Sequence, residues 1–89
     1  MAEETRLDGN AGGGLLAEVF RFEMTTARAT CAGCGRVAEV GAATAYALEM
    51  GLVLRCAGCE GVLLRVTHLH GVYRLDLRGI GLLELAPAG

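Results

Sequence analysis

Cys31–Cys34 and Cys56–Cys59 both spell Cys-Ala-Gly-Cys, and these two stretches contain every cysteine of the chain. Twenty-one residues separate one stretch from the other. Two residues between paired cysteines let a tight turn aim both sulfurs at one point, and Gly33 and Gly58 let the backbone curl without a side-chain clash. Four thiols in two close pairs predict one tetrahedral metal site with zinc as the expected ion, although the separation slightly exceeds the usual range of about 15–20 residues.

The predicted metal ligands are the sulfur atoms of Cys31, Cys34, Cys56 and Cys59. Three alternatives remain open for these thiols: a rubredoxin-like iron site for electron transfer, redox-active dithiols, and two disulfides. Rubredoxin-like sites usually pack aromatic side chains around the metal, and this chain has only two Tyr and two Phe. Redox-active Cys-x-x-Cys motifs usually begin a helix, whereas glycines and strand-forming residues surround both motifs here. Haem attachment is excluded, because it requires His directly after the second cysteine.

The chain is short enough for a metal to decide its folding. Its 89 residues have room for one domain with a modest core. Zinc binding contributes roughly 10–16 kcal/mol in small peptides at neutral pH. The whole stability of a typical domain is about 5–15 kcal/mol. We therefore expect the central part of the chain to depend on the metal for its structure.

Composition divides the chain into a flexible lead-in at 1–14, one domain at 15–86 and a tail at 87–89. The lead-in is polar and then glycine-rich, and the single proline of the chain lies in the tail. Glycine runs lower helix propensity and favour a mobile segment. We therefore expect all regular packing to lie inside the central range.

The segment before the first cysteine pair changes its hydrophobic period. Apolar residues four apart between Leu15 and Phe20 suit one short helix. Apolar and polar residues alternate after that point, which predicts a strand by Phe22. The β-branched Thr25 and Thr26 predict an extended approach to the first pair.

Short strands are predicted around both cysteine pairs. The range 36–40 suits a strand after the first pair, and 52–55 suits an apolar strand leading into the second. The alanine-rich range 41–51 suits a strand, a loop and a return. A last short strand is predicted over 82–85.

The strongest hairpin signal follows the second pair. The range 62–68 is rich in β-branched and aliphatic residues, and His70 and Gly71 suit a tight turn, since glycine adopts positive φ without strain. The range 72–78 then alternates, which predicts a half-buried strand with one wet face. The apolar members of this alternation are Tyr73, Leu75 and Leu77, and the polar members are Arg74, Asp76 and Arg78.

The two Cys-x-x-Cys knuckles on predicted hairpins, over roughly residues 28–62, resemble the zinc-ribbon class. That resemblance implies a ligand role for all four cysteines. The wider layout, with 7–10 (Leu-Asp-Gly-Asn) ahead and 76–79 (Asp-Leu-Arg-Gly) behind, is similar to a family of short actinobacterial proteins of unknown function. It implies no activity. The predicted fold is a mostly β, small zinc-ribbon-like domain with an additional C-terminal hairpin over 62–78 and room for one short N-terminal helix.

Histidines and arginines offer further candidate sites. His68 and His70 project from one face if the strand continues through them, where they would bind a second metal or titrate near neutral pH. A solvated turn is the simpler interpretation. Arg28, Arg36 and Arg55 lie near the cysteine pairs in sequence, where they would screen thiolate charge or form a small basic patch. Ordinary exposed arginines are the simpler interpretation.

The composition argues against catalysis. The chain has no Ser, its carboxylates are scattered, and neither a phosphate-binding loop nor a dinucleotide fingerprint is present. A four-cysteine zinc site is closed and leaves no position for substrate. We therefore expect a non-enzymatic module whose structural zinc supports binding to another protein or to a second copy of the chain.

Charge, hydropathy and the first residues limit which partners and which cellular compartment we expect. The formal charge of −2 disfavours nucleic acid, whose binders usually carry a basic excess. A transcription-related zinc ribbon that binds nucleic acid is nevertheless kept as the alternative, and an iron electron carrier ranks third. No apolar run approaches the roughly 20 residues of a membrane span. The acidic start, Met1–Glu4, is unlike a secretory signal, so we expect a cytoplasmic protein with no membrane partner.

Overall fold

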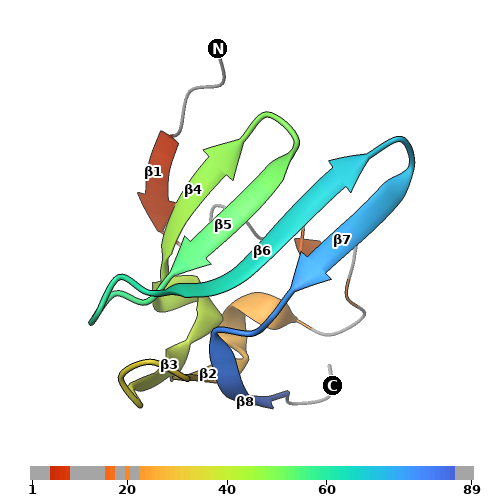
Figure 1. Cartoon of the computed structure of the whole chain (residues 1–89). Coiled ribbons are helices and arrows are strands. Elements are labelled where there is room, and N and C mark those ends of the chain that lie inside the picture. Colours follow the sequence, from red (N-terminus) through yellow and green to blue (C-terminus); the bar gives the residue numbers. More distant parts are fainter. Residues whose placement is uncertain (1–4, 9–15, 18–19, 21–22, 86–89) are drawn as a thin grey trace.

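A computed structural model of the chain describes residues 5–8, 16–17, 20 and 23–85, and these residues form mostly β structure in two sheets (Figure 1). The strands are β1 (Thr5–Asp8), β2 (Arg28–Cys31), β3 (Val37–Glu39), β4 (Thr44–Leu48), β5 (Gly51–Arg55), β6 (Val62–Leu69), β7 (Val72–Asp76) and β8 (Ile80–Glu84). Two short 3-10 helices are η2 (Met24–Thr26) and η3 (Val40–Ala42).

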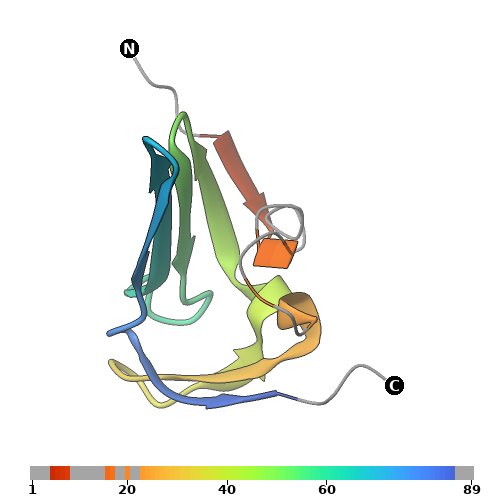
Figure 2. The same ribbon diagram turned by 90° about the vertical axis from the view of Figure 1, so that its right-hand side faces the viewer.

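Each of the two sheets carries one of the two cysteine pairs. One sheet has five antiparallel strands in the order β1-β4-β5-β6-β7, and the other has three in the order β3-β2-β8. The three-stranded sheet lies across one end of the five-stranded sheet (Figures 1 and 2). Each cysteine pair lies in the turn of one hairpin, so the fold is that of a small, mostly β, zinc-ribbon-like domain.

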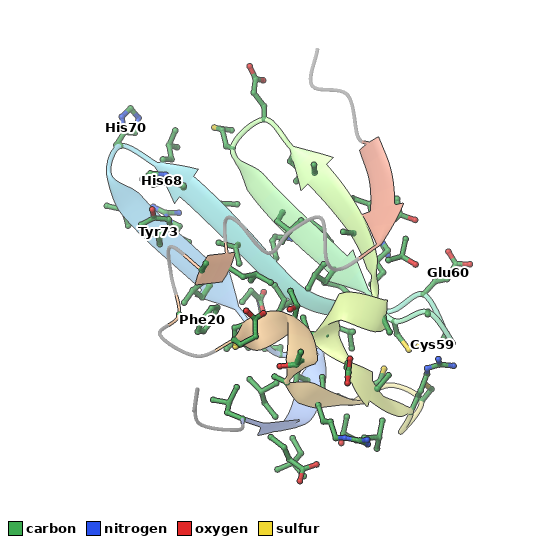
Figure 3. The ribbon with its side chains drawn as sticks, turned by 180° about the vertical axis from the view of Figure 1, so that it is seen from behind. Phe20, Cys59, Glu60, His68, His70 and Tyr73 are labelled. Atoms are coloured by element: carbon green, nitrogen blue, oxygen red, sulfur yellow. The ribbon has the colours of Figure 1, made fainter. Side chains whose placement is uncertain are left out.

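The predicted C-terminal hairpin is confirmed. β6 and β7 pair in register from Leu69↔Val72 onward, and β6 also pairs with β5, so the hairpin extends the sheet that carries the second cysteine pair. His70 and Gly71 form the turn with φ of +52° and +75°. Positive φ at both central residues is the mark of a type I′ turn, whose twist matches the flanking strands. Figure 3 shows His70 at this tip, at the opposite end of the molecule from Cys59.

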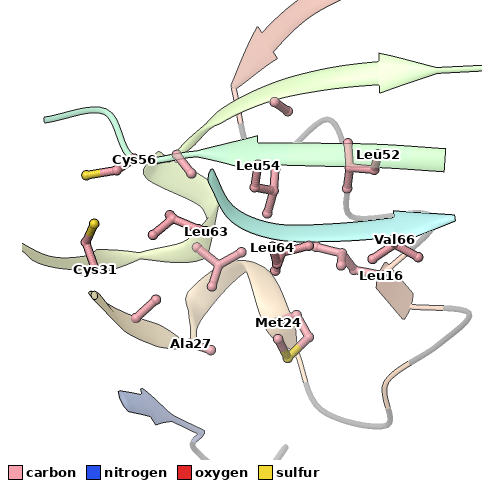
Figure 4. Packing of buried hydrophobic residues seen from close by; sticks show 14 residues of the cluster. Leu16, Met24, Ala27, Cys31, Leu52, Leu54, Cys56, Leu63, Leu64 and Val66 are labelled. Atoms are coloured by element: carbon pink, nitrogen blue, oxygen red, sulfur yellow. The ribbon is translucent and has the colours of Figure 1, made fainter. Parts of the chain in front are cut away.

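The core lies on one face of the five-stranded sheet, toward the three-stranded sheet. Alternate residues of β5 and β6 supply it, with Leu54, Leu64 and Val66 completely or almost completely buried. Leu16, which is 1% exposed, contributes from the N-terminal part of the chain (Figure 4). The side chains of a strand alternate between its two faces, which explains why residues two apart share this core.

The prediction of one buried face on the last strand of the hairpin is wrong. Leu75 and Tyr73 remain 44% and 38% exposed, although both belong to the apolar side of the alternation. Of the three predicted apolar residues, Leu77 packs against the core as a partly buried side chain. β7 is the outermost strand of its sheet and its turn end extends past the core. Position in the sheet therefore overrides the local pattern.

The segment before the first cysteine pair also differs from the prediction. Thr25 and Thr26 lie in η2 rather than in an extended strand, because the Glu23 side chain accepts a hydrogen bond from the backbone N–H of Thr25 at 3.1 Å. Such a cap stabilises a helical start. Met24 is thereby turned into the core at 2% exposure.

The predicted N-terminal helix and strand fall mainly outside the described residues. Leu16 and Ala17 are helical, and the Phe20 backbone N–H donates to the Leu16 carbonyl at 2.8 Å. The strand predicted by Phe22 lies outside the described residues. No helix among the described residues has the length and apolar character that crossing a membrane requires.

The expected lead-in contributes one strand to the sheet. β1 pairs with β4 in the register Thr5↔Ala47 to Asp8↔Thr44. Its backbone supplies the hydrogen bonds that β4 requires on its outer side. The remaining lead-in residues, 1–4 and 9–14, and the predicted tail at 87–89 lie outside the described part of the chain.

Candidate metal centre

The first cysteine pair occupies the turn between β2 and β3. The Cys31 backbone N–H donates to the Arg36 carbonyl at 2.9 Å, and the Gly35 N–H donates to the Cys31 carbonyl at 2.9 Å. Gly35 has φ of +79°, a left-handed conformation that glycine adopts without steric cost. These hydrogen bonds close the turn and leave Cys31 and Cys34 at its two ends.

The second pair repeats this turn between β5 and β6. The Cys56 backbone N–H donates to the Gly61 carbonyl at 2.8 Å, and the Glu60 N–H donates to the Cys56 carbonyl at 2.8 Å. Glu60 therefore occupies the position that Gly35 has in the first turn. It adopts the same left-handed conformation, with φ of +65°, despite its side chain.

The four cysteines meet in one cluster. All four Sγ atoms lie within 4.8 Å of one another, and the Cys31–Cys59 and Cys34–Cys56 Sγ distances are both 3.7 Å. A tetrahedral ion with metal–sulfur bonds of about 2.3 Å separates its sulfurs by about 3.8 Å. A disulfide would bring two sulfurs to about 2.0 Å, and all four cysteines are free thiols. The cluster therefore fits a metal ion held by four sulfurs, and the structure brings together all four residues that the sequence predicted.

Backbone donors point at the sulfurs from within the second turn. The Gly58 N–H donates to Cys56 Sγ at 3.3 Å, and the Gly61 N–H donates to Cys59 Sγ at 3.4 Å. Hydrogen bonds to the charged form of a ligand stabilise it and fix its orientation. The turn therefore stabilises the thiolate form of both cysteines and also positions their sulfur atoms.

The thiols do not all favour the charged form equally. Hydrogen bonds from backbone N–H groups, that of Cys59 above all, lower the pKa of Cys56 to about 7. The pKa of Cys31 is also lowered, chiefly by a hydrogen bond from the backbone N–H of Cys34. The pKa of Cys34 is raised to about 11, because interaction with the other thiols and burial outweigh the lowering effect of the Arg36 N–H. Four clustered thiolates need a cation to offset their mutual repulsion, and a divalent metal provides it.

The cluster lies at the boundary between core and surface. Cys31 and Cys56 are 5% and 3% exposed and belong to the hydrophobic core, whereas Cys34 and Cys59 are exposed. Figure 4 shows the sulfurs of Cys31 and Cys56 close together at one end of the core. An ion at this site would therefore connect the buried interior with both exposed turns.

Gly79 joins the two sheets beside the first turn. Its carbonyl accepts a hydrogen bond from the Ala32 backbone N–H at 2.8 Å. A Cβ atom at Gly79 would lie 1.7 Å from the Val62 carbonyl oxygen, so only glycine fits between the two backbones. Because Val62 begins β6, this residue links the first cysteine turn to the strand that follows the second.

Two of the three arginines near the cysteines contact the second turn. The Arg55 guanidinium donates to the Glu60 carbonyl at 3.1 Å and lies 5.6 Å above the Tyr46 ring. The Arg36 side chain passes close to Gly58, where its Cδ would be 3.1 Å from an added Cβ. Arg28 is exposed on β2. Arg55 is therefore hydrogen-bonded to the second turn, and Arg36 lies beside it.

The histidines do not belong to the cysteine cluster. His68 stacks on Tyr73 with 4.1 Å between ring centroids and 11° between planes, and His70 lies in the hairpin turn (Figure 3). Within the described residues, the four cysteines are the one group of His, Cys, Asp or Glu side chains arranged to hold a metal.

Comparison with protein families assigns the chain to a family. The model of the family of unknown function DUF6510 matches residues 2–88. The chain belongs to this family. The resemblance to a family of short proteins of unknown function is thereby confirmed, whereas no curated protein and no solved structure matches the chain significantly. Membership assigns no activity, so the function has to be argued from the cysteine cluster and the surface.

Proposed function

We propose that this DUF6510 protein is a small non-enzymatic module whose structural zinc ion stabilises a surface that binds another protein. The observation that carries the proposal is the convergence of four sulfurs within 4.8 Å. Four thiolates fill a tetrahedral coordination sphere and leave no open position for a substrate or an activated water. The site is therefore suited to stabilising the fold rather than to catalysis.

Zinc is preferred over iron on the chemistry around the cluster. Both ions accept four thiolates at similar distances, so sulfur geometry alone does not choose between them. An electron carrier of the rubredoxin type usually surrounds its iron with aromatic side chains. Here Phe20 and Tyr73 lie away from Cys59, and Tyr46 lies under Arg55 (Figure 3).

The β6–β7 hairpin supplies a surface suited to a protein partner. Four large apolar side chains near its tip are at least 38% exposed: Leu69, Val72, Tyr73 and Leu75. Single exposed apolar residues are common on protein surfaces, whereas contiguous groups mark interaction sites. Leu69 and Val72 are directly paired across the hairpin and share its outer face, whereas Tyr73 and Leu75 lie on the opposite face, so both faces of this hairpin present exposed apolar groups.

One observation favours nucleic acid as the second candidate partner. The strand registers place Arg55, Arg65 and Arg74 on the outer face of the five-stranded sheet, on the same side as Tyr46. Arginine beside an aromatic ring, here the half-buried Tyr46, suits a phosphate backbone and stacked bases. Asp76 shares this face, and the formal net charge of −2 opposes such binding. Binding to single-stranded RNA or DNA that weakens steeply with salt and is lost in Arg65→Ala would support this alternative.

Metal analysis of the purified full chain tests the first half of the proposal. We expect one zinc ion per chain and a colourless protein. A red protein with one iron per chain would replace the structural role with electron transfer. A folded protein without any metal would contradict both interpretations.

Affinity capture tests the second half. We expect the wild-type chain to retain a specific protein, or to associate with itself, and Val72→Asp to lose this binding. Leu82→Asp is the matched control, because Leu82 is 57% exposed on β8 and Val72 is 54% exposed on β7. Equal binding by both variants, or no partner and no self-association for the wild type, would contradict a protein-binding role for the hairpin.

A further inference from the structure

We propose that β7 pairs antiparallel with the β7 strand of a second copy of this chain, joining two five-stranded sheets into one. This inference rests on the proposed protein-binding function and names its partner. Strand addition at a sheet edge is a common mode of recognition, in which main-chain hydrogen bonds provide affinity and side chains provide specificity.

β7 forms a regular edge that no proline or bulge interrupts. Among the described strands it pairs with β6 alone, and all five of its side chains are exposed or partly exposed. The β6–β7 ladder is regular, whereas the β5–β6 ladder has a shift between Leu54 and Arg55. Edge strands are commonly protected by charged side chains, Pro or a bulge. β7 has no Pro and no bulge, and its two charged residues, Arg74 and Asp76, have opposite signs, so they can pair with those of a second copy.

The hairpin register determines which backbone groups point outward. In an antiparallel ladder closed by a two-residue turn, the pair next to the turn exchanges hydrogen bonds, as does every second pair after it. Leu69↔Val72 is that first pair, so Arg74 and Asp76 direct their backbone groups toward β6. The N–H and C=O groups of Leu75 are therefore directed toward the open edge.

The charges on β7 select one register for self-pairing. Symmetric pairing can be centred on Tyr73, Arg74, Leu75 or Asp76 of both copies. The Tyr73 centre would place Arg74 opposite Val72 and pair no opposite charges. Centres at Arg74 or Asp76 would place like charges directly opposite each other, which is unfavourable. The Leu75 centre instead places Arg74 opposite Asp76 of the second copy, twice by symmetry. It also brings Leu75, which is 44% exposed, against its own counterpart on the other face.

The side chains on β7 are prepared for these cross-strand pairs. Asp76 accepts hydrogen bonds from Arg78 at 2.7 and 3.1 Å, which lower the pKa of its carboxyl group to about 2 and keep it charged. A carboxylate has several acceptor positions and can bind a second guanidinium. Arg74 is exposed on the same face as Asp76, so it is available to the second copy.

β8, an edge strand of the other sheet, lacks this self-complementarity. Symmetric pairing centred on its exposed apolar residue, Leu82, would place Glu84 opposite Ile80. No opposite charges meet in that arrangement. The comparison therefore favours β7 and makes β8 a suitable control surface.

Sedimentation of metal-loaded full-length variants tests the inference. We expect wild type to dimerise in the micromolar range, since one short strand pair buries less than a standard interface. Arg74→Glu alone and Asp76→Arg alone should each weaken self-association by roughly ten- to thirtyfold, because each places like charges opposite each other twice. An equimolar mixture of the two variants should form a heterodimer again, since every cross-strand pair then joins opposite charges.

The mixture separates this inference from folding and from the broader function. Loss of folding in either variant would prevent recovery in the mixture, so circular dichroism of each variant alone is measured first. If Asp76→Arg fails to fold, Arg74→Glu combined with Asp76→Lys in one chain replaces it, and restored homodimers are then expected. A monomeric wild type, single variants that dimerise like wild type, or a mixture that stays monomeric overturns the inference. Capture of a different protein by a monomeric chain would overturn it while leaving the proposed function intact.

Discussion

The two cysteine turns have the same four residues and the same backbone hydrogen bonds, but they differ in the residue that follows. Gly35 follows the first turn and Glu60 follows the second, and both adopt positive φ. The first turn belongs to the three-stranded sheet and the second to the five-stranded sheet. In both turns the first cysteine is buried and the second is exposed.

This comparison shows what determines the sulfur geometry. The left-handed conformation is retained at Glu60 although a non-glycine residue adopts it at a cost of about 1 kcal/mol. The Arg55 side chain binds the Glu60 carbonyl, which supports that conformation. The hydrogen bonds of the turn, together with convergence on one site, therefore override the local preference of residue 60.

The largest expected effect comes from single substitutions of a cysteine, one variant for each turn. We expect Cys34→Ala and Cys56→Ala to lose the metal and unfold the central part of the chain, because roughly 10–16 kcal/mol of metal binding is coupled to folding. Thermal unfolding by circular dichroism and metal content measure both losses. If packing alone mattered, the exposed Cys34 would tolerate substitution and the buried Cys56 would not. His68→Ala is the control and should melt like wild type.

Acidification should produce the same loss reversibly. Protons compete with the metal for thiolates, so metal affinity falls as pH falls. The pKa of Cys56 is lowered to about 7, and the pKa of Cys31 is lowered as well. One cysteine in each turn therefore stays deprotonated at a lower pH than an ordinary thiol does. Zinc release followed with a chromogenic chelator should rise monotonically on acidification. Release on raising the pH instead would contradict thiolate ligation.

A methyl group at Gly79 should have the next largest effect. Gly79→Ala brings Cβ into the Val62 backbone and separates the two turns, so we expect a loss of about 2–4 kcal/mol in the free energy of unfolding. Gly81→Ala is the control, because its Cβ would meet neighbours at 3.8 Å or more. Urea unfolding that gives equal midpoints for both variants would contradict the close backbone contact.

The smallest expected effects have opposite signs in the two turns. Gly35→Ala should lower the free energy of unfolding by about 1 kcal/mol, and Glu60→Gly should raise it by about 0.5–1 kcal/mol, because both residues have positive φ. Gly33→Ala is the control, since its added Cβ meets sulfurs at an ordinary 3.7 Å. If Gly35→Ala and Glu60→Gly change the free energy of unfolding in the same direction, the two turns are not equivalent.

Local patterns predicted the cysteine cluster and the hairpin but not the surroundings that decide burial. The spacing of the cysteines and the His70–Gly71 turn act over a few residues, so sequence alone indicated them. The exposure of Leu75 depends on the edge position of β7, which is set by pairing between distant strands. The helical start at Thr25 depends on the side chain of Glu23 rather than on β-propensity.

Two features of the site itself were also missed. Aligning the two motifs places Glu60 on Gly35, which would have indicated a strained left-handed residue. The contact of Gly79 with Val62 had no comparable signal, because it joins backbones from different sheets. Residues that act through tertiary contact therefore escaped prediction, whereas those that act through spacing did not.

X-ray absorption at the metal edge of the purified protein tests the central claim most directly. Four sulfur neighbours at about 2.3 Å around one zinc ion are expected if both turns bind a single closed site. Nitrogen or oxygen neighbours, or two sulfurs alone, would show that the two cysteine turns do not share one ion.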